Sequence, residues 1–98
     1  MQARVARYVV APERCDEAVA AFQSAAREIM ASMSGLSGGY IFVDSETGTT
    51  MTITLWESQA ALDASGTRAA ALRQRAVHEV DGEVQSVQVF DVVRDFGG

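Results

Sequence analysis

The chain has 98 residues and a net charge of -5 at pH 7, and its eight basic residues are all arginines. Because nucleic-acid-binding proteins need a clustered positive surface, this charge disfavours nucleic acid as a partner. The single cysteine excludes an intrachain disulfide and a multi-cysteine metal site, and it suits a reducing compartment. We therefore expect one small domain, residues 1–98, without a bound metal.

No segment favours a membrane or a secretion pathway. The longest apolar run, Ala18–Phe22, is far shorter than the roughly 18 residues of a spanning helix. The first ten residues carry arginines but lack the apolar core of a signal peptide. We expect a cytoplasmic protein that does not bind membranes.

The first predicted strand, Ala3–Val10, has apolar residues on both sides, with Val5 and Val9 on one and Tyr8 and Val10 on the other. Pro12 ends this strand, because proline lacks the N–H that a sheet requires and its fixed φ suits a helix's first turn. A helix then extends to about Met33. Its apolar residues recur every three or four positions: Cys15, Ala18, Phe22, Ala25, Ile29 and Met33.

Gly35, Gly38 and Gly39 end this helix and permit a sharp return into a second strand, Tyr40–Val43. The polar segment Asp44–Thr49 has the composition of a hairpin loop. The next segment alternates strictly, with Met51, Ile53 and Leu55 on one side and Thr50, Thr52, Thr54 and Trp56 on the other. This alternation predicts a central strand.

Ser58 follows this strand directly and predicts a helix start, because its hydroxyl can accept a hydrogen bond from an early backbone N–H. The second helix is predicted from Ser58 to about Val80. We expect an interruption at Ser65–Thr67, where Gly66 lowers helix propensity. Asp81 and Gly82 then turn the chain into a last strand, Val84–Val93.

The element order β-α-β-β-α-β predicts an α+β, ferredoxin-like fold, an antiparallel four-stranded sheet with two helices on one face. The strands carry apolar residues on both sides, and one layer of helices covers only one of them. We therefore expect a homodimer through the helix-free sheet face.

The chain resembles the antibiotic-biosynthesis-monooxygenase-like family of the dimeric α/β-barrel superfamily over nearly its whole length. The resemblance is carried by three local patterns: Pro12-Glu13 before a helix with Phe22, Gly35-Leu36 before the second strand, and Leu55-Trp56-Glu57-Ser58 with Ala61 and Leu62. The resemblance implies a dimeric barrel with a pocket. The family includes cofactor-free oxygenases that act on polyketide-like aromatic substrates. The family's haem-degrading branch carries an asparagine, a tryptophan and a histidine where this chain has Ala6, Ser65 and Arg75. We expect no haem and no other cofactor.

Trp56 and Arg73 are the leading candidates for a binding site. Trp56 either stacks on a planar substrate or fixes the helix against the sheet. Arg73 lies in the middle of the apolar side of the second helix. Either its guanidinium meets an acidic residue, or it reaches into a pocket and binds an oxyanion.

Tyr8, Tyr40 and Phe22 complete the candidate pocket, which we expect between the sheet and the second helix. His78 lies about half a turn from the apolar side of that helix and is expected in solvent, and Cys15 is expected to be buried and inert.

Two functions remain open from the sequence. One is a cofactor-independent monooxygenase acting on a small aromatic substrate. The other is a non-catalytic small-molecule-binding or accessory dimer with the same pocket, which the absence of asparagine favours.

Overall fold

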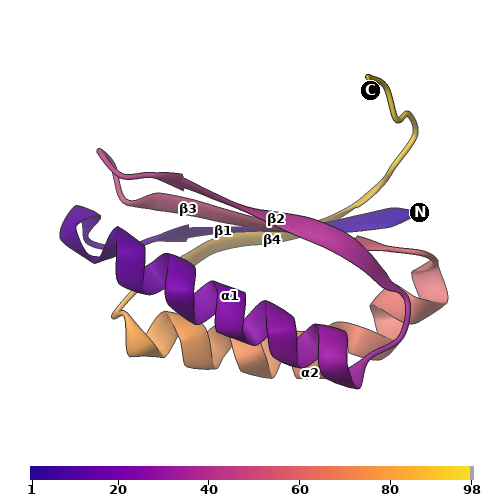
Figure 1. Cartoon of the computed structure of the whole chain (residues 1–98), viewed down its shortest axis with the longest axis horizontal. Coiled ribbons are helices and arrows are strands. Elements are labelled where there is room, and N and C mark those ends of the chain that lie inside the picture. Colours follow the sequence, from indigo (N-terminus) through magenta and orange to yellow (C-terminus); the bar gives the residue numbers. More distant parts are fainter. Residues whose placement is uncertain (98) are drawn as a thin grey trace.

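The computed structural model describes residues 1–97 as a four-stranded sheet with two helices on one of its faces (Figure 1). In chain order the elements are β1 (Gln2–Val9), a 3₁₀ turn (Pro12–Arg14), α1 (Cys15–Ser32), β2 (Leu36–Asp44), β3 (Thr49–Trp56), α2 (Gln59–Glu79) and β4 (Glu83–Asp91). The strands lie in the order β2-β3-β1-β4, and all neighbours are antiparallel. The predicted ferredoxin-like fold is confirmed.

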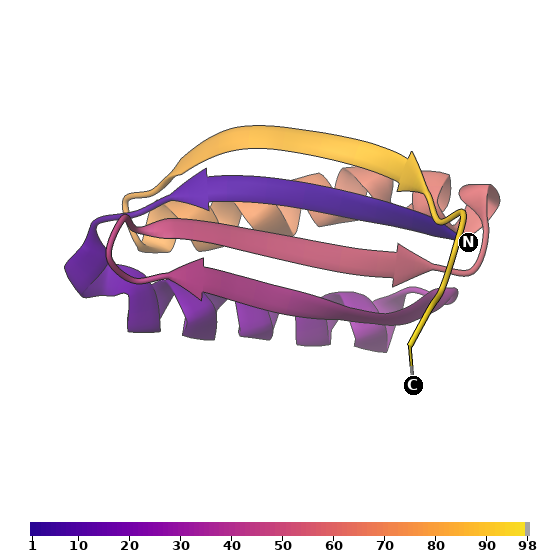
Figure 2. The same ribbon diagram turned by 90° about the horizontal axis from the view of Figure 1, so that it is seen from above.

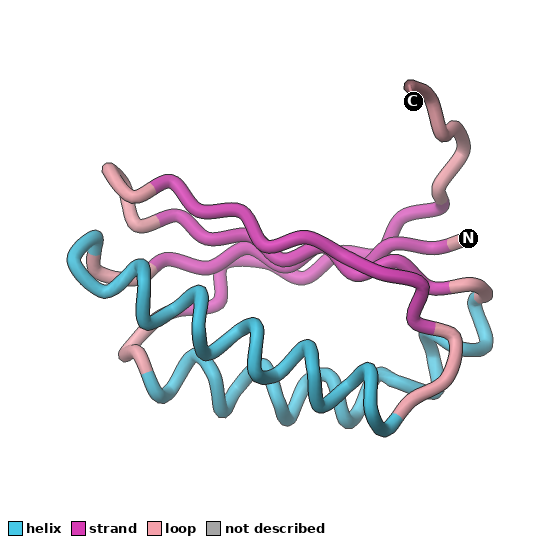
Figure 3. The backbone as a smooth tube through the Cα atoms, in the orientation of Figure 1, coloured by secondary structure: helices cyan, strands magenta, loops and turns pink. Residues whose placement is uncertain are grey.

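Strand pairing decides which side chains face the helices. β1 pairs with β3 so that Arg4 lies opposite Thr54, Ala6 opposite Thr52 and Tyr8 opposite Thr50, and these six residues point toward the helices. Both helices lie on that side of the sheet in Figure 3, and Figure 2 looks down on the opposite face. The strict alternation predicted for β3 is thus present, with its hydroxyl-bearing side turned inward.

Two groups of buried residues pack between the sheet and the helices. One joins the C-terminal half of β1 to the start of α1 and the end of α2, and its largest members are Tyr8 and Phe22. The other surrounds Trp56, which is fully buried among Ile29, Leu62 and Leu72. Both groups depend on apolar residues that recur at helical spacing in α1 and α2.

The expected interruption of the second helix is wrong, because α2 continues through Gly66 without a break. A glycine in a helix interior costs only about 1 kcal/mol, which tertiary contacts can offset. Here Ser65 is fully buried, and its hydroxyl donates to the backbone oxygen of Leu62 at 2.7 Å. β2 also begins four residues earlier than predicted, at Leu36 instead of Tyr40, across a register shift between Leu36 and Gly38.

The sheet face away from the helices, here called the open face, carries exposed aromatic side chains. Tyr40 and Phe42 of β2 are 60% and 49% exposed, and their rings stack with centroids 5.8 Å apart. Ile53 pairs with Tyr40 and extends the apolar surface onto β3. The segment after β4 leaves the sheet on this side (Figure 1) and includes the highly exposed Phe96.

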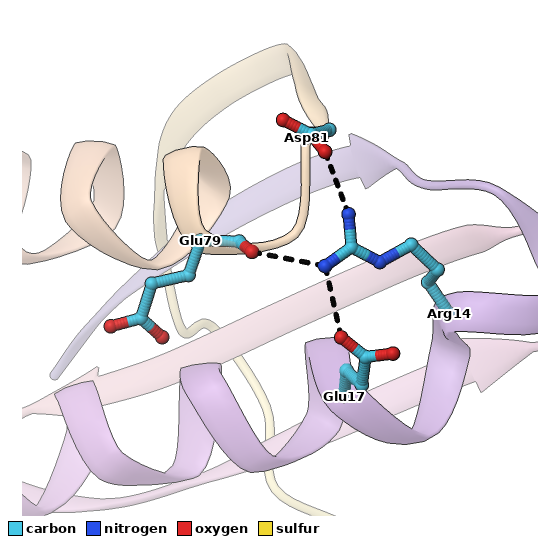
Figure 4. A network of polar contacts seen from close by, with 4 residues as sticks. All are labelled: Arg14, Glu17, Glu79 and Asp81. Atoms are coloured by element: carbon cyan, nitrogen blue, oxygen red, sulfur yellow. Dashed lines mark hydrogen bonds and ion pairs between the residues drawn. The ribbon is translucent and has the colours of Figure 1, made fainter.

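An arginine joins the two helices at the far end of the sheet from Trp56. Arg14 donates to Glu17 at 2.9 Å, to Asp81 at 2.8 Å and to the backbone oxygen of Glu79 at 3.1 Å (Figure 4). The hydrogen bond to Glu17 is the main cause that raises the pKa of Arg14 above its ordinary value. The start of α1 is thereby tied to the turn that ends α2.

Neither of the two helices in the described residues is long and apolar enough to cross a bilayer.

Candidate functional site

A cavity of about 610 Å³ lies between the sheet and α1, and α2 contributes to one of its walls through Ala69 and Arg73. We expected the pocket between the sheet and the second helix, and α2 supplies only a small part of its wall. Most of the helical wall comes from α1, including Val19, Phe22 and Ile29. The floor is formed by β1, β2 and β3.

Small side chains at facing positions leave this space open. The cavity is lined by Ala25 and Ala26 on α1, Ala6 on β1, Ala69 on α2 and Gly39 on β2. A helix and a sheet pack closely only where larger side chains fill the gap between them. Alanine and glycine at these positions do not fill it, so a cavity remains between the layers beside the two buried groups.

The structure brings four of the five candidate side chains together at this cavity: Trp56, Arg73, Tyr8 and Phe22. Tyr40 also borders it, but Tyr40 pairs with Ile53 on the open face, so its contribution comes from the backbone. Its ring points away from the cavity and stacks on Phe42 instead.

Tyr8 and Phe22 form an aromatic wall. Their ring centroids lie 4.3 Å apart with an interplanar angle of 28°, which is a stacked arrangement. The hydroxyl of Tyr8 lies 3.3 Å from the hydroxyl of Thr52, which also lines the cavity. This pair supplies polar atoms beside an otherwise apolar wall.

Trp56 lines the cavity but has its polar atom already engaged. Its indole Nε1 donates to the hydroxyl of Thr54 at 2.9 Å, and the side chain is fully buried. The indole N–H is therefore occupied within β3, and the ring, which has no exposed surface, is a buried part of the cavity wall. This packing supports the alternative in which Trp56 fixes the helix against the sheet, since the ring packs with Leu62 and Leu72 of α2.

Arg4 is the residue at the cavity that sequence reasoning missed. It is only 9% exposed, and its guanidinium lies 5.7 Å from the centre of the Trp56 ring. Nη1 donates to the hydroxyl of Ser65 and Nη2 to the backbone oxygen of Leu62, each at 3.1 Å. The sequence did carry a signal for this position. Side chains in a strand alternate between its two sides, so Arg4, two residues before Ala6 and four before Tyr8, lies on the same side of the strand as both.

Arg4 and Arg73 share the cavity as two positive charges. Burial is the main cause that lowers the pKa of Arg4, and the charge of Arg73 lowers it further, while Asp63 acts in the opposite direction. In residues 1–97 neither Arg4 nor Arg73 forms an ion pair with a carboxylate. Of the two alternatives for Arg73, the structure favours the one in which it borders a pocket.

The remaining candidates lie outside the cavity wall. His78 is exposed and Cys15 is buried in the core, as expected. Within the described chain, no group of three or more His, Cys, Asp or Glu side chains is arranged to hold a metal ion. Of the positions compared with the haem-degrading branch, Ser65 is buried beneath Arg4, and Arg75 forms an exposed ion pair with Glu28.

Comparisons with solved structures show the same fold in several proteins. SnoaB from Streptomyces nogalater, a cofactor-independent oxygenase, matches with a TM-score of 0.74 at 16% identity, covering 99% of this chain and 97% of that chain. Rv0793 from Mycobacterium tuberculosis matches with a TM-score of 0.70 at 16% identity, covering 98% of each chain. A conserved protein from Methanosarcina mazei Go1 matches with a TM-score of 0.69 at 16% identity, covering 91% of this chain and 89% of that chain.

At identities this low, these likenesses show the fold and not the activity. A comparison with curated proteins found no match. The family model described as antibiotic biosynthesis monooxygenase matches residues 1–82, which is most of the chain. The chain therefore belongs to the antibiotic biosynthesis monooxygenase family.

Proposed function

We propose that this protein is a cofactor-independent monooxygenase that oxidises a small, electron-rich aromatic substrate in the cavity. The observation that carries the proposal is a cavity of about 610 Å³ whose walls are apolar and aromatic and whose cationic groups are Arg4 and Arg73. Small-ligand sites commonly combine apolar walls with a few convergent polar groups. Family membership and the fold shared with SnoaB, a cofactor-independent oxygenase, support the same reaction class.

In this reaction the substrate itself supplies the electrons. A ring carbon conjugated with a carbonyl or phenolic group loses a proton to solvent, and the resulting carbanion attacks dioxygen to form a peroxide anion, which takes up a proton from solvent. Loss of water from the peroxide leaves one oxygen atom on the ring as a carbonyl and releases the other as water. Overall the substrate loses two hydrogens and gains one oxygen, so dioxygen is the only oxidant required.

The protein's part in this scheme is to position the ring and stabilise charge. Phe22 and Trp56 belong to the wall against which a planar substrate would lie, and Tyr8 and Thr52 bring hydroxyl groups to the same cavity. Arg73, which lines the cavity, would stabilise a developing oxyanion through its positive charge.

The test is oxygen consumption with 9-anthrone, whose ring carbon is acidic enough to form the carbanion. The expected result is one dioxygen consumed per anthraquinone formed, at a rate well above that of heat-denatured protein. Arg73→Gln should lower this rate about tenfold or more, since it removes a positive charge that stabilises the transition state. A rate equal to the denatured control with 9-anthrone and with 1-naphthol would overturn the proposal.

A second candidate function, a non-catalytic small-molecule-binding protein, is favoured by one observation. Of the described residues, no histidine or carboxylate side chain lines the cavity, so no conventional general base lies beside a bound ring. This candidate predicts saturable binding of aromatic ligands, measured by calorimetry, without oxygen consumption.

We propose that either function operates in a homodimer formed through the open face, with residues 1–98 as one domain. The exposed and stacked Tyr40 and Phe42 support this surface, together with the neighbouring Ile53 of β3. A domain of this size buries only about 60 to 65% of its unfolded surface, so covering a second apolar face adds substantially to its stability.

A further inference from the structure

We propose that Arg4 and Arg73 together bind an ionised oxygen group, a carboxylate or a phenolate, carried by the aromatic ligand of the cavity. This inference rests on the proposed use of the cavity as a ligand site and names the chemical class of that ligand. It does not require oxygen chemistry.

The first argument is the burial of a charge without an ion-pair partner. Arg4 is 9% exposed, and its hydrogen-bond acceptors are a serine hydroxyl and a backbone oxygen, both neutral. Buried arginines are normally paired with a carboxylate, because an unpaired charge in a protein interior is unfavourable. In the described part of the chain Arg4 lacks such a partner, and only the Trp56 ring and the Asp63 charge, which is not in contact with it, offset its charge, so a ligand anion could pair with it directly.

The second argument is that another cation faces the same cavity. Arg73 projects from α2 into the wall near Arg4, and its charge acts unfavourably on the Arg4 guanidinium. Two like charges repel more strongly in an environment of low dielectric constant than in water. A bound anion between them would relieve this repulsion, and a neutral ligand would not.

The third argument is geometric. A guanidinium has five N–H donors, and Arg4 directs one from Nη1 to Ser65 and one from Nη2 to Leu62, which leaves three. Guanidinium groups bind carboxylates through two parallel hydrogen bonds. The Arg4 guanidinium also lies over the indole of Trp56, so a ring that extends from the bound anion would run along the apolar wall.

The experiment uses two matched ligand pairs that share a nitrophenyl ring. One pair is 4-nitrobenzoate and 4-nitrobenzamide, and the other is 4-nitrophenol, at a pH where it is ionised, and 4-nitroanisole. Calorimetry gives the dissociation constant of each. The intact protein should bind the anion of at least one pair about tenfold or more tightly than its neutral partner, the size of one charge-assisted hydrogen bond. The pair that discriminates identifies the anion as carboxylate or phenolate.

Arg73→Gln should reduce this preference about tenfold and leave the neutral ligand's affinity unchanged. The matched control is Arg68→Gln, on the same helix but exposed and outside the cavity wall. Arg4→Lys keeps the charge without the planar fork and should weaken 4-nitrobenzoate specifically. If Arg4→Lys fails to fold, the comparison of Arg73→Gln with Arg68→Gln still tests the inference.

Equal affinity for anion and neutral partner in both pairs would overturn the inference, and so would equal losses in Arg73→Gln and Arg68→Gln. These outcomes are separate from the oxygen measurement. A clear anion preference without oxygen consumption supports this site and rejects the monooxygenase, and oxygen consumption without anion preference does the reverse.

Discussion

Arg4 on β1 donates a hydrogen bond to the hydroxyl of Ser65 on α2, with the two atoms 3.1 Å apart. The same hydroxyl donates to the backbone oxygen of Leu62, which also accepts a hydrogen bond from Arg4. This buried contact holds α2 against the sheet directly beside Gly66, where the helix has its weakest intrinsic preference.

Ser65→Ala should lower the free energy of unfolding by about 1 to 3 kcal/mol, because a buried cationic donor loses its acceptor. Urea denaturation measures the change. Ser24→Ala, at an exposed position of α1, is the control and should stay within about 0.5 kcal/mol of the original protein. Equal effects of the two substitutions would mean that the Arg4 contact contributes little to stability.

Planar aromatic ligands should quench the fluorescence of Trp56, the only tryptophan, because its ring lines the cavity. Quenching should saturate with ligand concentration. Ala26→Leu, which adds volume to the α1 wall, should abolish the saturable part while the emission of the free protein stays unchanged. Quenching that persists at full strength in this variant would place the bound ligand elsewhere.

Phe42→Arg should convert the expected dimer into a folded monomer, because it introduces a charge into the proposed apolar contact on the open face. Size-exclusion chromatography with light scattering gives the mass. Ala20→Arg, at an exposed position of α1, is the matched control and should leave the dimer intact. A monomer before any substitution would reject this interface altogether.

Arg14→Gln should lower the melting temperature, because it removes the ion pairs to Glu17 and Asp81 that join α1 to the end of α2. These pairs are solvent-accessible, so salt should screen them. The difference in melting temperature from the original protein should therefore shrink in about 1 M NaCl, where the screening length is about 3 Å. A difference that salt leaves unchanged would indicate that packing, and not charge, is lost.

The fold was predictable from the sequence because apolar residues recur at a different spacing in its strands and in its helices. The alternation through β3 and the three-to-four spacing in α1 each favoured one structure, and both were confirmed. The prediction of a helix break at Gly66 was wrong because helix propensity describes an isolated helix. In the folded protein Ser65 and Leu62 accept hydrogen bonds from Arg4 of β1, which is far away in the sequence.

The site was predictable only in part, since strand alternation separates two faces without saying which one the helices cover. Both sides of β2 carry large apolar residues, so Tyr40 gave no sign that its ring would point to the open face. Arg4 was missed for a related reason. A strand arginine usually faces solvent, and only the pairing of Arg4 with Thr54 shows that it faces inward.

The small residues that line the cavity have an evolutionary consequence. A single base change turns any alanine codon into a valine codon, and Ala6, Ala25, Ala26 and Ala69 all line the empty space. Added methyl groups there occupy a void and displace no packed neighbour, so they cost less stability than the same change in a filled core. Descendants of this gene can therefore alter the size and shape of the ligand they accept in single mutational steps, while the layers of the protein stay as they are.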